Sequence, residues 1–129
     1  MKIDELMIGD HIIAYNQFKI IRKIDKKKNE VYCEESITSI EDKDIHPIPI
    51  TSEILEKNGF KEDVHNCSIF YDWSNLDGDD VTLRRYPCGY FELHITDNEN
   101  LRNVRFPIDY VHELQHALRL CGIDKEIEL

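Results

Sequence analysis

Short runs of apolar residues, separated by polar turns, fill the first half of the chain. Runs of this length with alternating or continuous apolar positions predict β-strands. The strands predicted in this half cover residues 11–15, 18–24, 30–34 and 36–40. Several short strands joined by tight turns predict a small, strongly bent antiparallel sheet, such as that of an SH3-like barrel.

An extended segment and a short helix follow these strands. Pro47 and Pro49 fix their own φ angles and keep the residues before them out of the helical region. Thr51 or Ser52 can then cap a short helix, and Gly59 suits the left-handed position just after its end.

The second half of the chain returns to strands and closes with one longer helix. The predicted strands cover residues 67–73, 81–86, 90–96 and 103–106. The turn-forming residues at 87–89 predict that the second and third of these strands form a hairpin. Pro107 and Gly122 favour the start and the end of a helix, which predicts a helix over residues 108–121.

These elements predict an α+β protein with two lobes. Residues 1–50 would form a small β-rich, SH3-like lobe, and residues 51–129 a lobe with an antiparallel sheet and a C-terminal helix packed on it. At a length of 129 residues, the two lobes are expected to form one compact unit.

The charge of the chain restricts its partners. Charged residues make up 33% of the sequence and its formal net charge is −10. A charge of this sign opposes non-specific binding to a phosphate backbone, so general nucleic-acid binding is not expected. An acidic protein can instead bind a basic surface of another protein.

The cysteine pattern and the hydropathy predict a cytoplasmic protein. The four cysteines are scattered and form no CxxC pair, which argues against a zinc ribbon or a redox motif. We find neither a signal-peptide pattern nor an apolar run of membrane-spanning length, so no membrane association is expected.

The predicted C-terminal helix contains the sequence HELQH. On a helix, His112 and His116 would face the same way and could bind one Zn²⁺, while Glu113 could act as the catalytic base. A catalytic zinc needs a third protein ligand as well. His94 is the candidate on a central strand, and Cys88 or Cys67 would be the alternative thiolate.

Helical periodicity explains the same segment without a metal. Six residues gather on one arc of the helix, which would pack on the sheet: Tyr110, Val111, Leu114, Ala117, Leu118 and Cys121. His112, His116 and Arg119 would lie on the opposite side, facing solvent. This pattern favours an ordinary structural helix and predicts that no cofactor is bound.

A group of cations and one tyrosine forms a second candidate site. Its members are Arg84, Arg85, Arg102, Arg105 and Tyr86. On adjacent strands they could bind a small anionic ligand. The simpler interpretation is cross-strand pairing with Glu92 and nearby aspartates, and we favour it.

Three segments resemble a family of small proteins encoded by Bacteroidetes genomes, their phages and their mobile elements. The segments are MKIDELMIGD at 1–10, PIPITSEILEKNGF at 47–60 and YVHELQ at 110–115. Together they cover less than half of the chain. The resemblance implies no established activity and no functional residues.

The sequence favours a non-enzymatic accessory protein of phage or mobile-element type. It would bind a host protein or a small anionic ligand, and one version is an anti-defence protein, for which a homo-oligomer would be suitable. The alternative from another class is a zinc metallohydrolase that uses the HELQH helix. A third hypothesis, an acidic nucleic-acid mimic, requires carboxylates aligned on one face.

Overall fold

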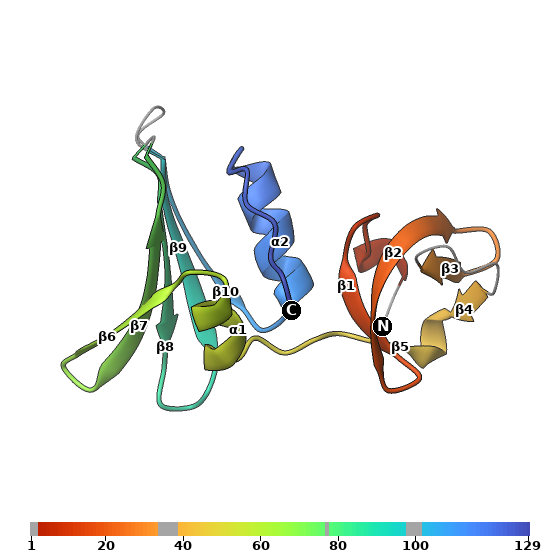
Figure 1. Ribbon diagram of the computed structural model, residues 1–129, viewed down its shortest axis with the longest axis horizontal. Helices are drawn as coiled ribbons and strands as arrows, with labels where there is room; N and C mark the ends of the chain where they lie inside the picture. Colours follow the sequence, from red (N-terminus) through yellow and green to blue (C-terminus); the bar gives the residue numbers. More distant parts are fainter. Residues whose placement is uncertain (1–2, 34–38, 77, 98–101) are drawn as a thin grey trace. The chain divides into compact units, whose positions relative to one another are not determined.

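The structure, a computed structural model, describes residues 3–33, 39–76, 78–97 and 102–129. The chain is α+β and contains two five-stranded antiparallel sheets (Figure 1). It divides into two units. The first comprises residues 1–49 with 110–112, and the second comprises residues 50–109 with 113–129. The segment 110–112 therefore belongs to the first unit, whereas the sequence pattern assigns it to the second lobe.

The first unit is a small, bent sheet. Its elements are η1 (Ile3–Glu5), β1 (His11–Ala14), β2 (Gln17–Asp25), β3 (Glu30–Cys33), β4 (Ser39–Glu41), η2 (Asp42–Asp44) and β5 (Ile45–His46), and its strand order is β4-β3-β2-β1-β5. A register shift between Ile21 and Lys23 allows the long strand β2 to bend. This arrangement confirms the predicted small, strand-rich lobe. The strand predicted over 36–40 lies partly outside the described residues, and β4 begins at Ser39.

Apolar residues at alternate strand positions form the core of this unit. The fully or nearly buried members are Ile3, Leu6, Ile12, Ala14, Ile21, Val31, Cys33, Ile40 and Ile45. In β1 the burial alternates along the strand, as expected for a sheet with one covered face.

The second unit is built on the other sheet. Its elements are α1 (Ser52–Lys57), β6 (Lys61–His65), β7 (Ser68–Ser74), β8 (Asp80–Arg85), β9 (Phe91–Asp97), β10 (Arg102–Ile108) and α2 (Val111–Leu120), of which residues 113–120 belong to this unit. The strand order β10-β9-β8-β7-β6 follows the chain in reverse, so that every neighbouring pair is antiparallel. The predicted hairpin of β8 and β9 is confirmed.

The strand register gives this sheet one covered face and one open face. On the covered face Tyr71 lies opposite Leu83, which in turn lies opposite Leu93, and all three are buried. The same face carries Val81, Phe91, Ile95 and Ile108. The two helices, the residue Phe60 after α1 and the C-terminal tail complete this core. The buried residues of the helices and the tail are Leu55, Leu114, Ala117, Leu118, Ile123 and Ile127.

The start of α1 and the C-terminal ends of both helices agree with the predictions from the sequence. Thr51 caps α1 by accepting a hydrogen bond from the backbone N–H of Ile54 at 3.2 Å. Gly59 follows α1 with φ of 86°, and Gly122 follows α2 with φ of 72°. After α2, Ile123 donates to the carbonyl of Leu118 at 2.9 Å, which completes a Schellman motif.

The predicted start of the last helix was wrong. Pro107 lies in β10, opposite Glu92, and α2 begins only at Val111. Strand β10 is at the edge of the sheet, where a proline can be accommodated because its missing N–H need not bond to a neighbouring strand. Within the described ranges, neither helix is long and apolar enough to cross a membrane.

Candidate functional site

The HELQH segment forms the first half of α2, and its acidic residue caps the helix. The carboxylate of Glu113 accepts a hydrogen bond from the backbone N–H of Asp109 at 3.1 Å. This contact resembles the back-bonding of a capping box, in which an acidic side chain in the first turn reaches the chain before the helix. The residue expected to serve as a catalytic base thus has a structural role.

Gln115 of the same segment binds the C-terminal tail. It is only 1% exposed. Its side-chain amide donates to the carbonyl of Lys125 at 2.9 Å and accepts from the N–H of Ile127 at 2.7 Å. One amide side chain therefore satisfies two backbone groups, as a neighbouring strand would.

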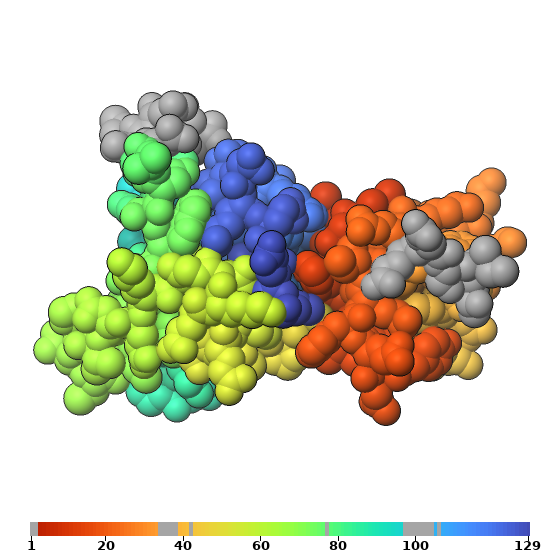
Figure 2. All heavy atoms as spheres, in the orientation of Figure 1, coloured from red at the N-terminus to blue at the C-terminus, as the bar shows by residue number. Residues whose placement is uncertain are grey.

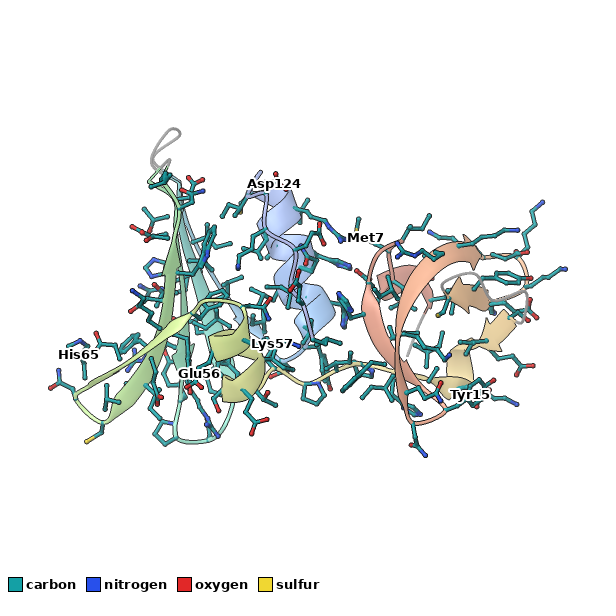
Figure 3. The ribbon with its side chains drawn as sticks, viewed as in Figure 1. Met7, Tyr15, Glu56, Lys57, His65 and Asp124 are labelled. Atoms are coloured by element: carbon teal, nitrogen blue, oxygen red, sulfur yellow. The ribbon has the colours of Figure 1, made fainter. Side chains whose placement is uncertain are left out.

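Asn58 binds the tail in the same manner. Its amide donates to the carbonyl of Glu128 at 2.6 Å and accepts from the N–H of that residue at 2.7 Å. Lys57 donates to the carbonyl of Leu129, and Figure 3 shows Lys57 at this end of α1. Figure 2 shows the tail in dark blue, next to the yellow-green atoms of α1. The C-terminal tail that follows α2 is thus part of the folded unit.

The predicted solvent-facing side of α2 was wrong for one of its residues. His112 is 5% exposed, and its ring stacks on Tyr110 with centroids 5.9 Å apart. His116 and Arg119 are half-buried. The predicted apolar arc is confirmed at its centre, since Val111, Leu114, Ala117 and Leu118 are buried. Gln115, outside the predicted arc, is buried as well, where the tail returns along the helix.

The candidate metal ligands come from different faces and turns. His94 lies on β9 between Leu93 and Ile95, whose side chains point to the covered face, so His94 points to the open face and away from α2. Cys88 and Cys67 are exposed in turns. Among the described residues, no three histidine, cysteine or acidic side chains are arranged to hold a metal ion.

The open face of the second sheet carries polar residues in rows across the strands. One row crosses all five strands and consists of Lys61, Asp72, Thr82, His94 and Arg105. Within this row, the hydroxyl of Thr82 donates to Asp72 at 2.8 Å. Neighbouring side chains in such a row have Cβ atoms about 5 Å apart, close enough to act on one ligand.

A second row brings together part of the predicted anion-binding group. The guanidinium of Arg84 lies 4.5 Å from the ring centroid of Tyr86 and donates to Ser68 at 3.1 Å. The rings of Tyr86 and Tyr90 stack with centroids 4.6 Å apart. Partial desolvation raises the pKa of the Tyr90 phenol above its ordinary value, and the electrostatic effect of the neighbouring Tyr86 adds to this rise.

The carboxylate of Glu92 neutralises positive charge nearby. It lies 3.5 Å from Nε of Arg105 and accepts a hydrogen bond from the Tyr86 hydroxyl at 3.3 Å. Arg85 lies opposite Phe91, on the other face of the sheet from Arg84. The side chain of Arg102 is outside the described residues. The geometry thus places Arg84, Arg105 and Tyr86 on one face and pairs Arg105 with an acid.

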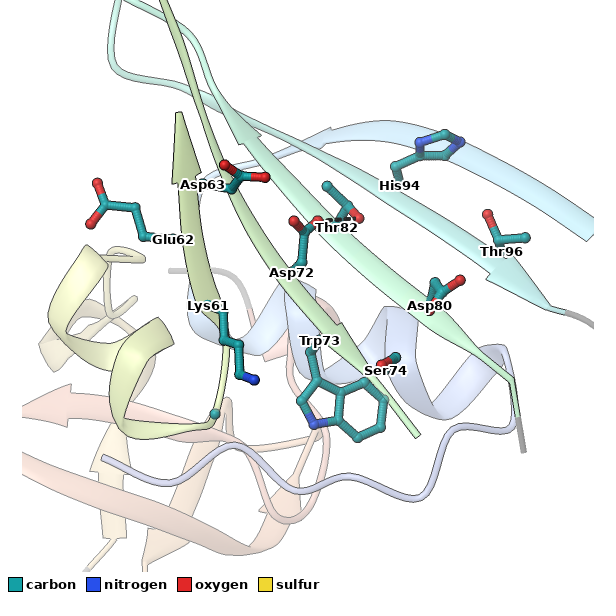
Figure 4. A pocket seen from close by; sticks show the side chains of 11 residues that line it. Lys61, Glu62, Asp63, Asp72, Trp73, Ser74, Asp80, Thr82, His94 and Thr96 are labelled. Atoms are coloured by element: carbon teal, nitrogen blue, oxygen red, sulfur yellow. Dashed lines mark hydrogen bonds between the residues drawn. The ribbon is translucent and has the colours of Figure 1, made fainter. Parts of the chain in front are cut away.

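An acidic pocket of about 850 Å³ lies at one corner of the open face (Figure 4). Its lining consists of Gly59, Lys61, Glu62, Asp63, Asp72, Trp73, Ser74, Asp80, Thr82, His94 and Thr96. Strand β6 begins opposite Asp72, so Trp73 and Ser74 extend beyond it. Trp73 lies opposite the buried Val81, on the covered side, so the pocket reaches around the edge of the sheet.

Trp73 already binds a cation on its ring. The ammonium group of Lys125 lies 5.0 Å from the ring centroid, a cation–π distance. Burial lowers the pKa of Lys125 below its ordinary value.

Sequence reasoning did not single out the acidic pocket. Apart from Gly59, its members come from four strands. One of those strands, β6, was not predicted because all five of its residues are exposed and show no alternation. One signal in the sequence could have indicated part of the pocket. The predicted β8–β9 hairpin has a register that places Thr82 opposite His94.

Comparisons with protein families, with curated proteins and with solved structures found no match to the chain.

Proposed function

We propose that the protein is a non-enzymatic accessory protein of phage or mobile-element type that acts by binding a protein of its host. The observation that carries this proposal is the open face of the second sheet, where polar, charged and aromatic side chains stand in rows across five strands. Rigid strands hold such rows in fixed positions, which is what a specific protein interface requires. The resemblance to proteins of phages and mobile elements supports the accessory role, and blocking a host defence effector is one form of it.

A host protein is preferred to a small anionic ligand. The site for an anion would be formed by Arg84 and Arg105, but the carboxylate of Glu92 lies beside Arg105. Arg84 stacks on aromatic rings and bonds to Ser68. An incoming anion would have to compete with these contacts. Carboxylates also outnumber cations in the pocket, which opposes a nucleotide.

The contacts of α2 support a structural interpretation of the HELQH segment. Glu113 caps the helix and Gln115 holds the tail, so two of the five residues of the motif have roles in folding. We expect protein purified without a histidine tag to contain no stoichiometric zinc in elemental analysis. Stoichiometric zinc that disappears in His116→Ala would reverse this interpretation in favour of the metallohydrolase.

Affinity capture from a lysate of the host tests the proposed function. We expect the immobilised protein to retain a specific host protein, and Thr82→Arg to lose it because a bulky cation then stands at the centre of the open face. Gln17→Arg, which adds the same side chain to an exposed position of the first unit, should retain the partner. The proposal would be contradicted if the Thr82→Arg variant retained the host protein as well as the native chain does. Substrate turnover that depends on Glu113 would contradict it as well.

A further inference from the structure

Strand β6 offers a free edge to an additional strand. It pairs with β7 on one side, and among the described residues no strand pairs with its other side. All five of its residues are exposed. The backbone groups on such an edge are a template for an extended peptide, which can join a sheet by adding a strand.

The charges on and beside β6 favour a basic peptide. Glu62 and Asp63 lie in the middle of the strand, and Asp72 and Asp80 follow on the next two strands. Among the described residues, Glu62 and Asp80 form no ion pair. Carboxylates on an edge strand oppose pairing with a second copy of the same chain, because like charges would face each other. They favour a strand that carries lysine or arginine.

The acidic pocket provides a place for the side chains of such a peptide. It is continuous with β6, since three residues of that strand line it together with Asp72, Asp80 and Trp73 (Figure 4). Its carboxylates suit a basic side chain, because Asp72 and Asp80 can form charge-assisted hydrogen bonds with it.

We infer that the partner presents an extended, basic segment that pairs with β6 and inserts a lysine or arginine side chain into the acidic pocket. This inference rests on the proposed function and specifies the chemistry of the partner. The edge of β6 selects an extended backbone, and the pocket selects its charge. A basic segment of a nucleic-acid-binding protein would have this chemistry.

The test is a fluorescence titration of the intact protein with a short synthetic peptide in which arginine alternates with serine. Trp73 is the only tryptophan of the chain and lines the pocket, so its emission reports binding directly. We expect a saturable change at low salt that weakens as salt is added. The double variant Asp72→Asn with Asp80→Asn should bind roughly tenfold more weakly.

Three controls make the titration specific. Asparagine at position 72 keeps an oxygen that can accept from Thr82, and circular dichroism should show an unchanged fold. Asp4→Asn with Glu5→Gln removes the same net charge from exposed positions of the first unit and should leave affinity unchanged. A peptide with methylated backbone nitrogens, which cannot pair with β6, should bind much more weakly than its parent.

Each outcome supports or overturns the inference. Binding that depends on Asp72 and Asp80 and on the peptide backbone supports it. No saturable binding, or equal binding by the double variant, overturns it. Spermine binding as tightly as the peptide would instead identify a polyamine site. A host protein could also be captured in a way that depends on Thr82 but is unaffected by salt and by the double variant. This result would overturn the inference of a basic segment and leave the proposed function intact.

Discussion

At the scale of single residues, Gln115 and Asn58 replace the strand neighbour that the C-terminal tail lacks. Each amide donates to one backbone carbonyl of the tail and accepts from one N–H. These contacts matter because the apolar residues Ile123 and Ile127 are buried, which takes the backbone beside them out of water. The two side chains therefore stabilise the folded conformation of the tail.

Gln115→Leu should lower the free energy of unfolding by about 1–3 kcal/mol, because the carbonyl of Lys125 and the N–H of Ile127 lose their partner. Urea denaturation followed by Trp73 fluorescence measures the effect. Asp124→Asn, at an exposed position of the same tail, is the matched control and should change little. Equal stability of Gln115→Leu and the native chain would show that the tail does not depend on this amide.

Glu113 should contribute to stability through its cap. Glu113→Ala removes the acceptor for the Asp109 N–H and is expected to cost about 0.5–1 kcal/mol. Glu113→Gln keeps an oxygen that can accept this hydrogen bond and should cost less. Thermal unfolding of the two variants checks the order. A larger loss in Glu113→Gln than in Glu113→Ala would contradict the capping role.

At the scale of elements, the ends of the helices and the position of β10 organise the second unit. Gly122 turns the chain out of α2 so that the tail can return along the helix. Pro107 is tolerated because β10 is an edge strand. Strand β6 lies at the opposite edge of the sheet, and this edge position explains why all five of its residues are exposed.

Gly122→Ala tests the turn after α2 without steric complications. A Cβ at this position would meet no atom within 4 Å, so the cost comes from the backbone conformation alone. With φ at 72°, the substitution should destabilise by about 1–2 kcal/mol. Chemical denaturation measures it, with Ala replacing the exposed Glu56 of α1 as the helix control. No loss of stability would show that the chain leaves α2 by another route.

At the scale of the whole molecule, the surplus of carboxylates affects which partners the protein can bind and how stable its fold is. A net charge of −10 on a small protein creates self-repulsion that added salt screens. The pocket beside β6 is one place where this surplus is organised.

Thermal unfolding at neutral pH should therefore shift to higher temperature as sodium chloride is added. The gain is expected to be about 1 kcal/mol or less, because solvent already screens exposed charges. The control is the same series near pH 5, close to the sequence pI of about 5.0, where the net charge and hence the salt effect should largely vanish. A fall in the unfolding temperature with salt at neutral pH would mean that attractive pairs dominate.

The sequence alone determined the α+β class, most strand positions, the start of α1 and the C-terminal ends of both helices. These features depend on local rules: alternation of apolar positions, a threonine before α1 and glycines after both helices. Local rules act within a few residues, so they can be read from one segment at a time.

Only the tertiary structure decided how the HELQH segment is used and where the acidic pocket lies. Gln115 binds residues 125 and 127, and Asn58 binds residue 128, contacts that no local pattern encodes. The pocket depends on the register of β6, β7, β8 and β9, which sets the face on which each side chain stands. A shift of one residue would invert those faces, and the register is fixed by long-range packing of the covered side.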